Sequence, residues 1–261
     1  MHRIFLSFIF FLLLGNWSPV LAIYDPLSVP NNRTGVHILD PSEVFRASQL
    51  VNSNGGNWGY VTIPIRSNDR DYFKWEAFFK ACREFHLIPI IRLATYPVEN
   101  IWVEPTVFDI IDFANFLNLF PWPTQNRYIV LFNEPNHSKE WGGTISPENY
   151  VLISRFSFET FKQTSPDFFL ITAGLDMSAP TNHTSLDALA FYKRMFAIDS
   201  GWPKYFDGFS FHPYPNPDFS SSVFSKTRYG IRSFEFELNY LKRYDIIPKY
   251  IFSNFSDLYL I

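Results

Sequence analysis

The stretch Tyr128-Ile-Val-Leu-Phe132, which runs directly into Asn133-Glu134-Pro135-Asn136, decides the fold. An unbroken apolar run of this length predicts a buried strand, and the amide, the carboxylate and the proline predict a loop at its end. Enzymes with parallel sheets carry their chemistry in such loops, because the carboxyl ends of the strands meet at one edge. Glu134 is therefore either the solvated carboxylate of a turn or a catalytic group, and the rest of the sequence favours catalysis.

Outward from this strand, short apolar runs alternate with amphipathic helical stretches, which is the pattern of a parallel α/β fold. The predicted strands are residues 35–39, 59–65, 88–94, 128–132, 169–173 and 206–211, followed by a helix near 231–244 and a last apolar run at 250–252. Asp40-Pro41 and Ser146-Pro147 each offer an N-cap side chain and a proline at the first helical position. A helix between them is expected to bury one apolar face, formed by Val107, Ile110, Ile111, Ala114 and Leu117.

The order of these elements favours an incomplete (β/α)8 TIM barrel over a doubly wound sheet. A doubly wound fold usually carries a glycine-rich phosphate loop after its first strand, and here that strand ends in Leu39-Asp40-Pro41. The sequence supplies about six and a half β/α units before Ile261, whereas a closed barrel has eight. We therefore expect a C-terminally incomplete barrel.

Residues 1–22 predict a secretory signal peptide. A basic start at Met1-His2-Arg3 precedes the apolar block Ile4–Leu14, which is too short to span a bilayer comfortably, and Val20-Leu21-Ala22 resembles a cleavage site. The mature chain is then one domain, residues 23–261, secreted or periplasmic, with no membrane contact beyond the signal peptide. An uncleaved anchor is the alternative.

The composition argues against a nucleic-acid partner. Net charge is −3 and charged residues make up 18% of the chain, so no strongly basic surface is expected. The aromatic content of 20% suits both a packed core and stacking on sugar rings. The single cysteine, Cys82, lies in an apolar helical pattern and predicts a buried, inert thiol. Asn-X-Ser/Thr triplets begin at Asn32, Asn136, Asn182 and Asn254 and matter only in a host that glycosylates.

Two motifs resemble those of a known enzyme group. Asn133-Glu134-Pro135 after the fourth predicted strand and His212-Pro213-Tyr214 after the sixth are similar to the clan A glycoside hydrolases, retaining (β/α)8 enzymes that include cellulases, mannanases and families 5 and 39. The resemblance runs from about residue 34 to residue 214. It implies hydrolysis of a β-linked oligo- or polysaccharide without a cofactor, with Glu134 as general acid/base, Asn133 as a substrate-binding residue, and His212 and Tyr214 lining the cleft.

The resemblance breaks down at the second catalytic group. Retaining hydrolysis needs a nucleophilic carboxylate about 5 Å from the acid/base, and the clan places it after strand seven. Asn254 occupies that position here, and an amide is a poor nucleophile. The preferred interpretation is a truncated or frame-shifted inactive gene product. Two others stay open: a non-catalytic carbohydrate-binding relative, or an enzyme that uses another carboxylate, such as Asp40, Glu104, Asp176 or Asp257.

Further binding residues are expected in loops that follow strands, since these face the active side of a barrel. Trp141 and, with less support, Trp102 are candidates for stacking on a sugar ring. Arg92 and His37 lie within predicted strands as inward-facing polar residues that need partners; the resemblance implies an Arg near the cleft floor. No spacing of His and Cys predicts a metal site.

Overall fold

The computed structural model describes residues 33–216, 219–222, 224–246 and 251–253. The predicted signal peptide, residues 1–22, and Asn254 lie outside the described residues. Among the helices that are described, none combines the length and the apolar character needed to cross a membrane.

The elements follow the predicted alternation. The strands are β1 (Gly35–His37), β2 (Gly59–Arg66), β3 (Leu87–Ala94), β4 (Pro97–Val98), β5 (Ile101–Trp102), β6 (Arg127–Val130), β7 (Phe168–Ile171), β8 (Phe209–Phe211) and β9 (Ile251–Ser253). The α-helices are α1 (Val44–Val51), α2 (Tyr72–Glu84), α3 (Val107–Asn118), α4 (Pro147–Thr164), α5 (Ala188–Ile198) and α6 (Ser233–Leu241). Short 3-10 turns are η2 (Pro41–Glu43), η3 (Ser53–Gly55), η4 (Ser138–Glu140), η5 (Trp202–Tyr205) and η6 (Lys242–Tyr244).

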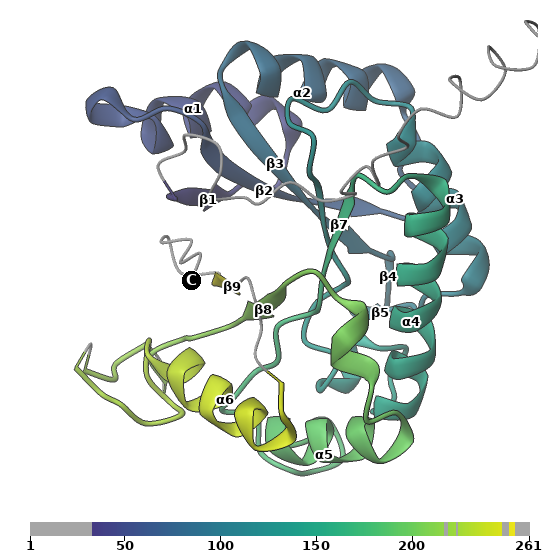
Figure 1. Cartoon of the computed structure of the whole chain (residues 1–261), viewed down its shortest axis with the longest axis vertical. Coiled ribbons are helices and arrows are strands. Elements are labelled where there is room, and N and C mark those ends of the chain that lie inside the picture. The colour runs from purple at the N-terminus through teal and green to yellow at the C-terminus, as the bar shows by residue number, and fades with distance from the viewer. Residues whose placement is uncertain (1–32, 217–218, 223, 247–250, 254–261) are drawn as a thin grey trace, which may run out of the picture.

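Seven of these strands follow one another around a barrel in chain order. Five form a parallel sheet in the order β1-β2-β3-β6-β7, and β8 pairs in parallel with β9. Two parallel bridges, Ile171 to Gly208 and Asp176 to His212, connect β7 to the β8 segment. Helices α2 to α5 lie outside the strands (Figure 1). The predicted fold, an incomplete (β/α)8 barrel, is confirmed.

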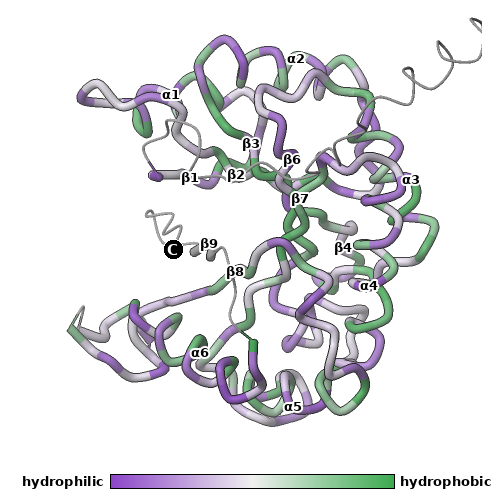
Figure 2. Tube along the Cα trace, in the orientation of Figure 1, coloured by the Kyte–Doolittle hydropathy of each residue, from purple (hydrophilic) through white to green (hydrophobic). Residues whose placement is uncertain are grey.

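Two apolar cores sit on opposite sides of the strands. The larger packs the strands against the outer helices. The smaller lies inside the barrel and takes alternate residues of four neighbouring strands: Tyr60, Ile88, Ile90, Tyr128, Val130, Phe169 and Ile171. Figure 2 shows the apolar colouring where β6 and β7 run through the centre. Strands buried on both faces explain why the sequence shows apolar runs rather than a simple alternation.

The predicted helix starts are confirmed in atomic detail. The Asp40 carboxylate accepts a hydrogen bond from the Ser42 amide at 2.9 Å, and Glu43 reaches back to complete a capping box at η2. The Ser146 hydroxyl accepts from the Asn149 amide at 3.1 Å and starts α4. Cys82 is buried and burial raises the pKa of its thiol, in line with the inert cysteine that was predicted.

The expected apolar face of α3 was partly wrong. Val107 and Ile111 are 40% and 41% exposed, while Phe113 is fully buried beside Ile110 and Leu117. Residues three and seven positions after Ile110 share its face, whereas Ile111 is rotated by one residue step toward solvent. The buried stripe is therefore centred on the Ile110, Phe113 and Leu117 line.

A hairpin after β3 was not predicted. Strands β4 and β5 pair antiparallel around Glu99 and Asn100, whose φ angles are 49° and 68°. Two consecutive positive φ angles are what a tight two-residue hairpin requires. The hairpin carries Trp102 above the end of β3.

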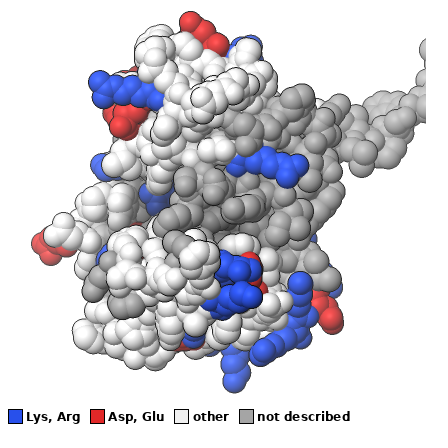
Figure 3. All heavy atoms as spheres, turned by 90° about the vertical axis from the view of Figure 1, so that its left-hand side faces the viewer, with Lys and Arg blue, Asp and Glu red and all other residues white. Residues whose placement is uncertain are grey.

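The surface face shown in Figure 3 carries charged side chains of both signs. Lys and Arg side chains do not merge there into one continuous band. The absence of a nucleic-acid partner stays a prediction from the composition.

Candidate active site

The backbone after β6 has an irregular conformation that sets the directions of the Asn133 and Glu134 side chains. Phe132 has a φ of 72° and Glu134 a φ of 34°, both in the left-handed region that residues with side chains rarely adopt. The Tyr128 and Val130 side chains point into the barrel, yet the Phe132 side chain packs in the outer core. The strict alternation therefore ends at Phe132, and the Asn133 side chain lines a pocket at the strand end.

Glu134 is held by a histidine that directly follows β8. Nδ1 of His212 lies 2.7 Å from Oε1 of Glu134, and the Glu134 amide donates to the Gly174 carbonyl at 3.2 Å. His212 itself is buried, with 4% of its surface exposed. A Cβ on Gly174 would lie 2.3 Å from Cδ2 of His212, so this glycine makes room for the imidazole. Three strand ends, those of β6, β7 and β8, thus fix one carboxylate.

Arg92 and His37 face the same interior. Thr62 of β2 pairs with both His37 and Ile90, and in-register residues of neighbouring parallel strands point to the same side. The pKa of His37 is lowered to about 4, mainly because burial removes hydration and to a lesser extent because of the charges of Arg92 and His212. Part of the His37 surface nevertheless stays exposed. With this pKa, His37 is neutral at pH 7.

Arg92 continues the inward series Ile88, Ile90 and Arg92 along β3. Burial lowers its pKa, and the nearby Glu140, Tyr214 and Glu134 oppose that effect. The Tyr214 ring also lies 5.7 Å from the His212 ring. The structure thus brings six of the predicted residues to one end of the barrel: His37, Arg92, Asn133, Glu134, His212 and Tyr214.

The loop after β6 is joined to the loop after β7 by a buried asparagine. Asn136 is fully buried, and its side-chain amide donates to the Asp176 and Leu186 carbonyls at 3.0 Å each. Its side-chain oxygen accepts from the Asp176 amide at 3.1 Å. The Asn136 triplet that was noted as a glycosylation sequence is therefore inaccessible in the folded protein.

Asp176, one of the alternative second carboxylates, is committed to loop contacts. Its Oδ2 lies 2.9 Å from Nε2 of His137, and its Oδ1 accepts from the Ser178 amide and hydroxyl at 2.8 and 2.6 Å. Burial alone would raise the pKa of Asp176, but these hydrogen bonds outweigh it and lower the pKa to about 2. The hydrogen bond between His137 and Asp176 is also the largest cause of the raised pKa of His137. The pair ties two loops together.

The prediction that Trp141 stacks on a sugar was wrong. Trp141 is fully buried, its indole N–H donates to Oδ1 of Asn149 at 3.0 Å, and its ring packs edge-on against Phe132 and Tyr150. The core under the loop packs against the Trp141 ring, and Asn149 accepts its N–H, so neither face of the ring is accessible to a ligand.

Glu140 was missed by the sequence reasoning. Its Oε2 accepts a hydrogen bond from Nδ2 of Asn133 at 3.3 Å. Burial raises the pKa of Glu140, and the neighbouring Glu134 adds to the rise while Asn133, Lys139 and Arg92 reduce it. The signal in the sequence is Glu140-Trp141-Gly142-Gly143, an acid before paired glycines in the loop that already carries the motif.

No group of three or more His, Cys, Asp or Glu side chains within the described ranges could hold a metal ion.

Two solved structures share the fold over most of the chain. A glucosidase from Croceicoccus marinus matches with a TM-score of 0.55 at 10% identity, over 85% of this chain and 52% of its own. A family 51 alpha-L-arabinofuranosidase from Bifidobacterium longum matches with a TM-score of 0.54 at 12% identity, over 88% of this chain and 57% of its own. The fold is that of the glycoside hydrolase barrels. It agrees with the fold that the resemblance to clan A implied.

The chain spans 52% and 57% of the lengths of these two proteins. A scan against protein-family models and a search of curated sequences give no match.

Proposed function

We propose that the chain carries the acid/base part of a glycoside hydrolase active site and acts on the O-glycosyl bond of a β-linked glycan with retention. The observation that carries the proposal is the 2.7 Å contact between His212 Nδ1 and Glu134 Oε1, made where β6 and β8 end. The barrel fold shared with a glucosidase and an alpha-L-arabinofuranosidase supports a glycoside as the substrate.

The contact suits a general acid. When Nδ1 of His212 carries its proton, it donates to Oε1, so the acidic proton of neutral Glu134 resides on Oε2. Oε2 can then protonate the leaving oxygen while a second carboxylate attacks the sugar carbon, and the Glu134 carboxylate can take a proton from the water that hydrolyses the resulting glycosyl ester. A carboxylate other than Glu134 must supply that nucleophile. We propose that the side-chain amide of Asn133, which precedes Glu134, binds a sugar hydroxyl.

A second candidate function is non-catalytic carbohydrate binding. The observation that favours it is Asn254, which directly follows β9 where the resemblance expects the nucleophile. A neutral amide supplies neither the attack on the sugar carbon nor the charge that stabilises an oxocarbenium ion.

Glu134→Gln tests the acid/base role on a panel of aryl β-glycosides. Loss of general acid catalysis should cost about 100-fold or more for substrates with poor leaving groups. The loss should shrink for dinitrophenyl glycosides, whose leaving group needs no proton. Glu84→Gln, at the exposed end of α2, is the matched control and should retain full activity. Equal activity of wild type and Glu134→Gln would exclude Glu134 as the acid/base.

Asn254→Glu separates the two candidate functions. If the site lacks only a nucleophile, this variant gains hydrolysis of aryl β-glycosides over wild type. If wild type binds β-linked disaccharides but neither it nor Asn254→Glu hydrolyses any glycoside, the binding function is the better description.

We further propose that the protein is exported, as residues 1–22 predict. N-terminal sequencing of the exported protein should begin near Ile23. Recovery of a chain that still carries Met1 would favour an uncleaved anchor instead.

A further inference from the structure

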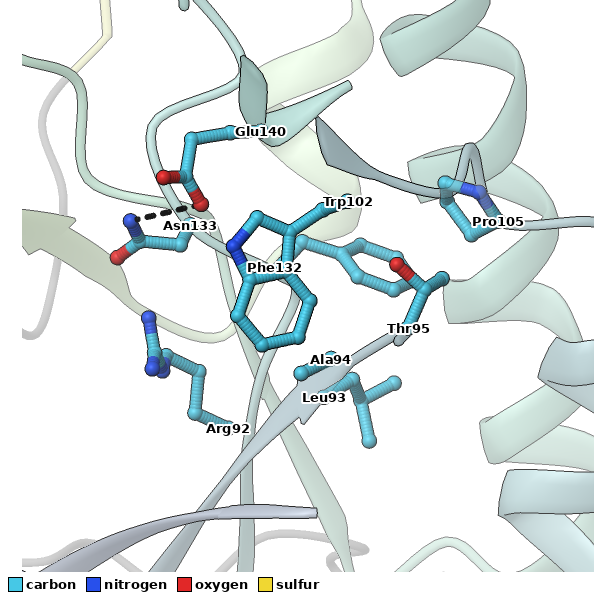
Figure 4. Close-up of a pocket in the computed structure, with 9 residues that line it drawn as sticks. All are labelled: Arg92, Leu93, Ala94, Thr95, Trp102, Pro105, Phe132, Asn133 and Glu140. Carbon is cyan, nitrogen blue, oxygen red and sulfur yellow. Dashed lines mark hydrogen bonds between the residues drawn. The ribbon is translucent and has the colours of Figure 1, made fainter. Parts of the chain in front are cut away.

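A pocket of about 150 Å³ lies beside Glu134 and is not used by the proposed proton transfer. Its lining comes from the end of β3, the β4-β5 hairpin and the loop after β6. Figure 4 shows Arg92, Trp102, Phe132, Asn133 and Glu140 around it. Glu134 is not part of the lining, so the pocket neighbours the catalytic carboxylate rather than containing it.

The two loops that form the pocket are fastened to each other. The Gly142 amide, in the loop after β6, donates to the Trp102 carbonyl of the hairpin at 2.8 Å. Gly142 has a φ of 60°, and a Cβ there would lie 2.9 Å from the Cβ of Glu104. A side chain at this position would therefore push the hairpin away from the loop that holds Glu140.

Several polar groups converge on the pocket. Within the described residues, Glu140 accepts a hydrogen bond from Asn133 at Oε2, and its Oε1 lies 3.9 Å from Nζ of Lys139. Nε of Arg92 is buried and has no hydrogen-bond partner within the described part of the chain. Figure 4 shows the Arg92 head group and the nitrogen edge of the Trp102 indole turned toward Asn133. A ligand here meets two donors and one carboxylate with spare acceptor capacity.

The charges of the pocket select among ligand classes. Glu140 opposes an anionic ligand, and Arg92 opposes a cationic one, so the pair suits a neutral ligand. The rings of Trp102 and Phe132 add an apolar wall. A sugar ring matches both requirements, because its C–H groups pack on apolar surfaces while its hydroxyl groups form hydrogen bonds.

We propose that Glu140 and Trp102 form a subsite for one sugar ring next to the bond that Glu134 protonates, with Glu140 accepting hydrogen bonds from its hydroxyl groups. This assignment rests on the proposed function. It makes Glu140 a specificity-determining residue, since the orientation of those hydroxyl groups differs between sugars.

Binding is measured first, apart from catalysis. The Glu134→Gln protein is titrated with cellobiose, β-1,4-mannobiose and β-1,4-xylobiose, and tryptophan fluorescence and calorimetry report the dissociation constants. Adding Glu140→Gln should weaken the preferred disaccharide about 10-fold or more, as expected for a hydrogen bond to a charged group. It should also reduce the difference in affinity among the three probes. Trp102→Leu should weaken binding and remove most of the fluorescence change.

The matched control is Glu84→Gln, an exposed carboxylate at the end of α2 that does not line the pocket. It should leave all three dissociation constants unchanged. Circular dichroism of each variant shows whether the barrel is folded.

Activity then separates this inference from the proposed function. If wild type hydrolyses glycosides, Glu140→Gln should raise KM with little change in kcat. Unchanged KM and unchanged selectivity in that variant would overturn the subsite while leaving hydrolysis intact. If wild type is inactive but binding depends on Glu140, the proposed subsite is supported and the proposed hydrolytic function is contradicted. Failure of all three disaccharides to bind the Glu134→Gln protein would overturn the subsite.

Discussion

Gly174 shows how one missing Cβ makes room for the His212 side chain in the candidate active site. The backbone after β7 passes so close to His212 that only a glycine leaves room for the imidazole, and the same glycine carbonyl accepts the Glu134 amide. Any side chain at position 174 therefore disturbs the histidine that orients the proposed acid.

We expect Gly174→Ala to lower the free energy of unfolding by about 1–3 kcal/mol, the usual cost of overpacking a buried site. It should also reduce hydrolysis or sugar binding, because His212 must move. Thermal unfolding and the aryl glycoside assay measure the two effects.

Gly143→Ala is the matched control. Its φ of 80° strains an alanine backbone, but the nearest atom to the added Cβ is 3.7 Å away. A stability loss of about 1 kcal/mol without loss of function is expected. Equal functional losses in the two variants would contradict a specific role for the Gly174 space.

At this scale the sequence predicts residue types at strand ends better than side-chain directions. Glu134 and His212 could be found because the strand pattern places both at the same barrel end. Trp141 could not be placed, since its ring direction depends on Phe132 and Asn149, which meet it only in three dimensions. Glu140 was missed because its importance arises from a neighbour, Asn133, and from burial.

At the scale of elements, α5 and α6 meet through a buried acid. The Tyr192 hydroxyl donates to Oε1 of Glu237 at 2.6 Å, and Oε2 of this fully buried Glu has no hydrogen-bond partner in the described residues. Burial raises the pKa of Glu237 to about 8, and the Tyr192 bond and the Arg228 charge only partly oppose that rise.

The contact between α5 and α6 should therefore weaken with rising pH. Between pH 4.5, the ordinary pKa of Glu, and about pH 8, folded Glu237 keeps a proton that the unfolded chain has lost. The free energy of unfolding falls across this window, by at most about 1.4 kcal/mol per pH unit from this group.

Glu237→Gln removes that titration, so its stability relative to wild type should improve as pH rises through the window. Urea unfolding at several pH values measures the difference. His37, whose lowered pKa acts in the opposite direction near pH 4 to 6.5, is common to both proteins and cancels. A constant difference between them at all pH values would show that Glu237 does not titrate in this window.

Elements with a local signal were predictable and those without one were not. Asp40 and Ser146 start helices through hydrogen bonds to residues two or three positions away, so their sequence neighbours suffice. The Glu99-Asn100 turn carries no glycine and was overlooked. The strand predicted from residue 206 begins at Phe209, because the Asp207 carboxylate accepts the Leu170 amide at 2.8 Å instead.

At the scale of the whole molecule, the outer core is one continuous cluster that reaches from α1 to α6. The described barrel should therefore unfold as one unit. Phe161 of α4 is fully buried and packs edge-on against Phe168 of β7, with ring centroids 4.9 Å apart.

Phe161→Ala should lower the free energy of unfolding by about 3–5 kcal/mol, the cost of a large cavity. The decrease in the free energy of unfolding should be the same when it is measured by near-ultraviolet circular dichroism, by fluorescence and by far-ultraviolet circular dichroism. Leu152→Ala, 64% exposed on the same helix, is the control and should change stability little. Transitions that separate between probes would show that the barrel unfolds in parts.

The barrel order could be predicted because each strand is followed by a helix, which forces neighbouring strands to run parallel. In the described part of the chain, strand pairing joins the five-stranded sheet to the β8-β9 pair only at the bridges Ile171 to Gly208 and Asp176 to His212, and no local pattern in the sequence encodes that division.

In any cell that attaches glycans to asparagine, glycosylation of Asn136 competes with folding, because folding buries this residue. A glycan on this residue would sever the three side-chain hydrogen bonds that join two loops, and it could be attached only before the barrel closes around them. Fast folding buries Asn136 before a glycan is attached, whereas slow folding leaves it accessible to glycosylation, which prevents these hydrogen bonds from forming. In such a cell, the fraction of molecules glycosylated at Asn136 would thus report how quickly this part of the barrel folds.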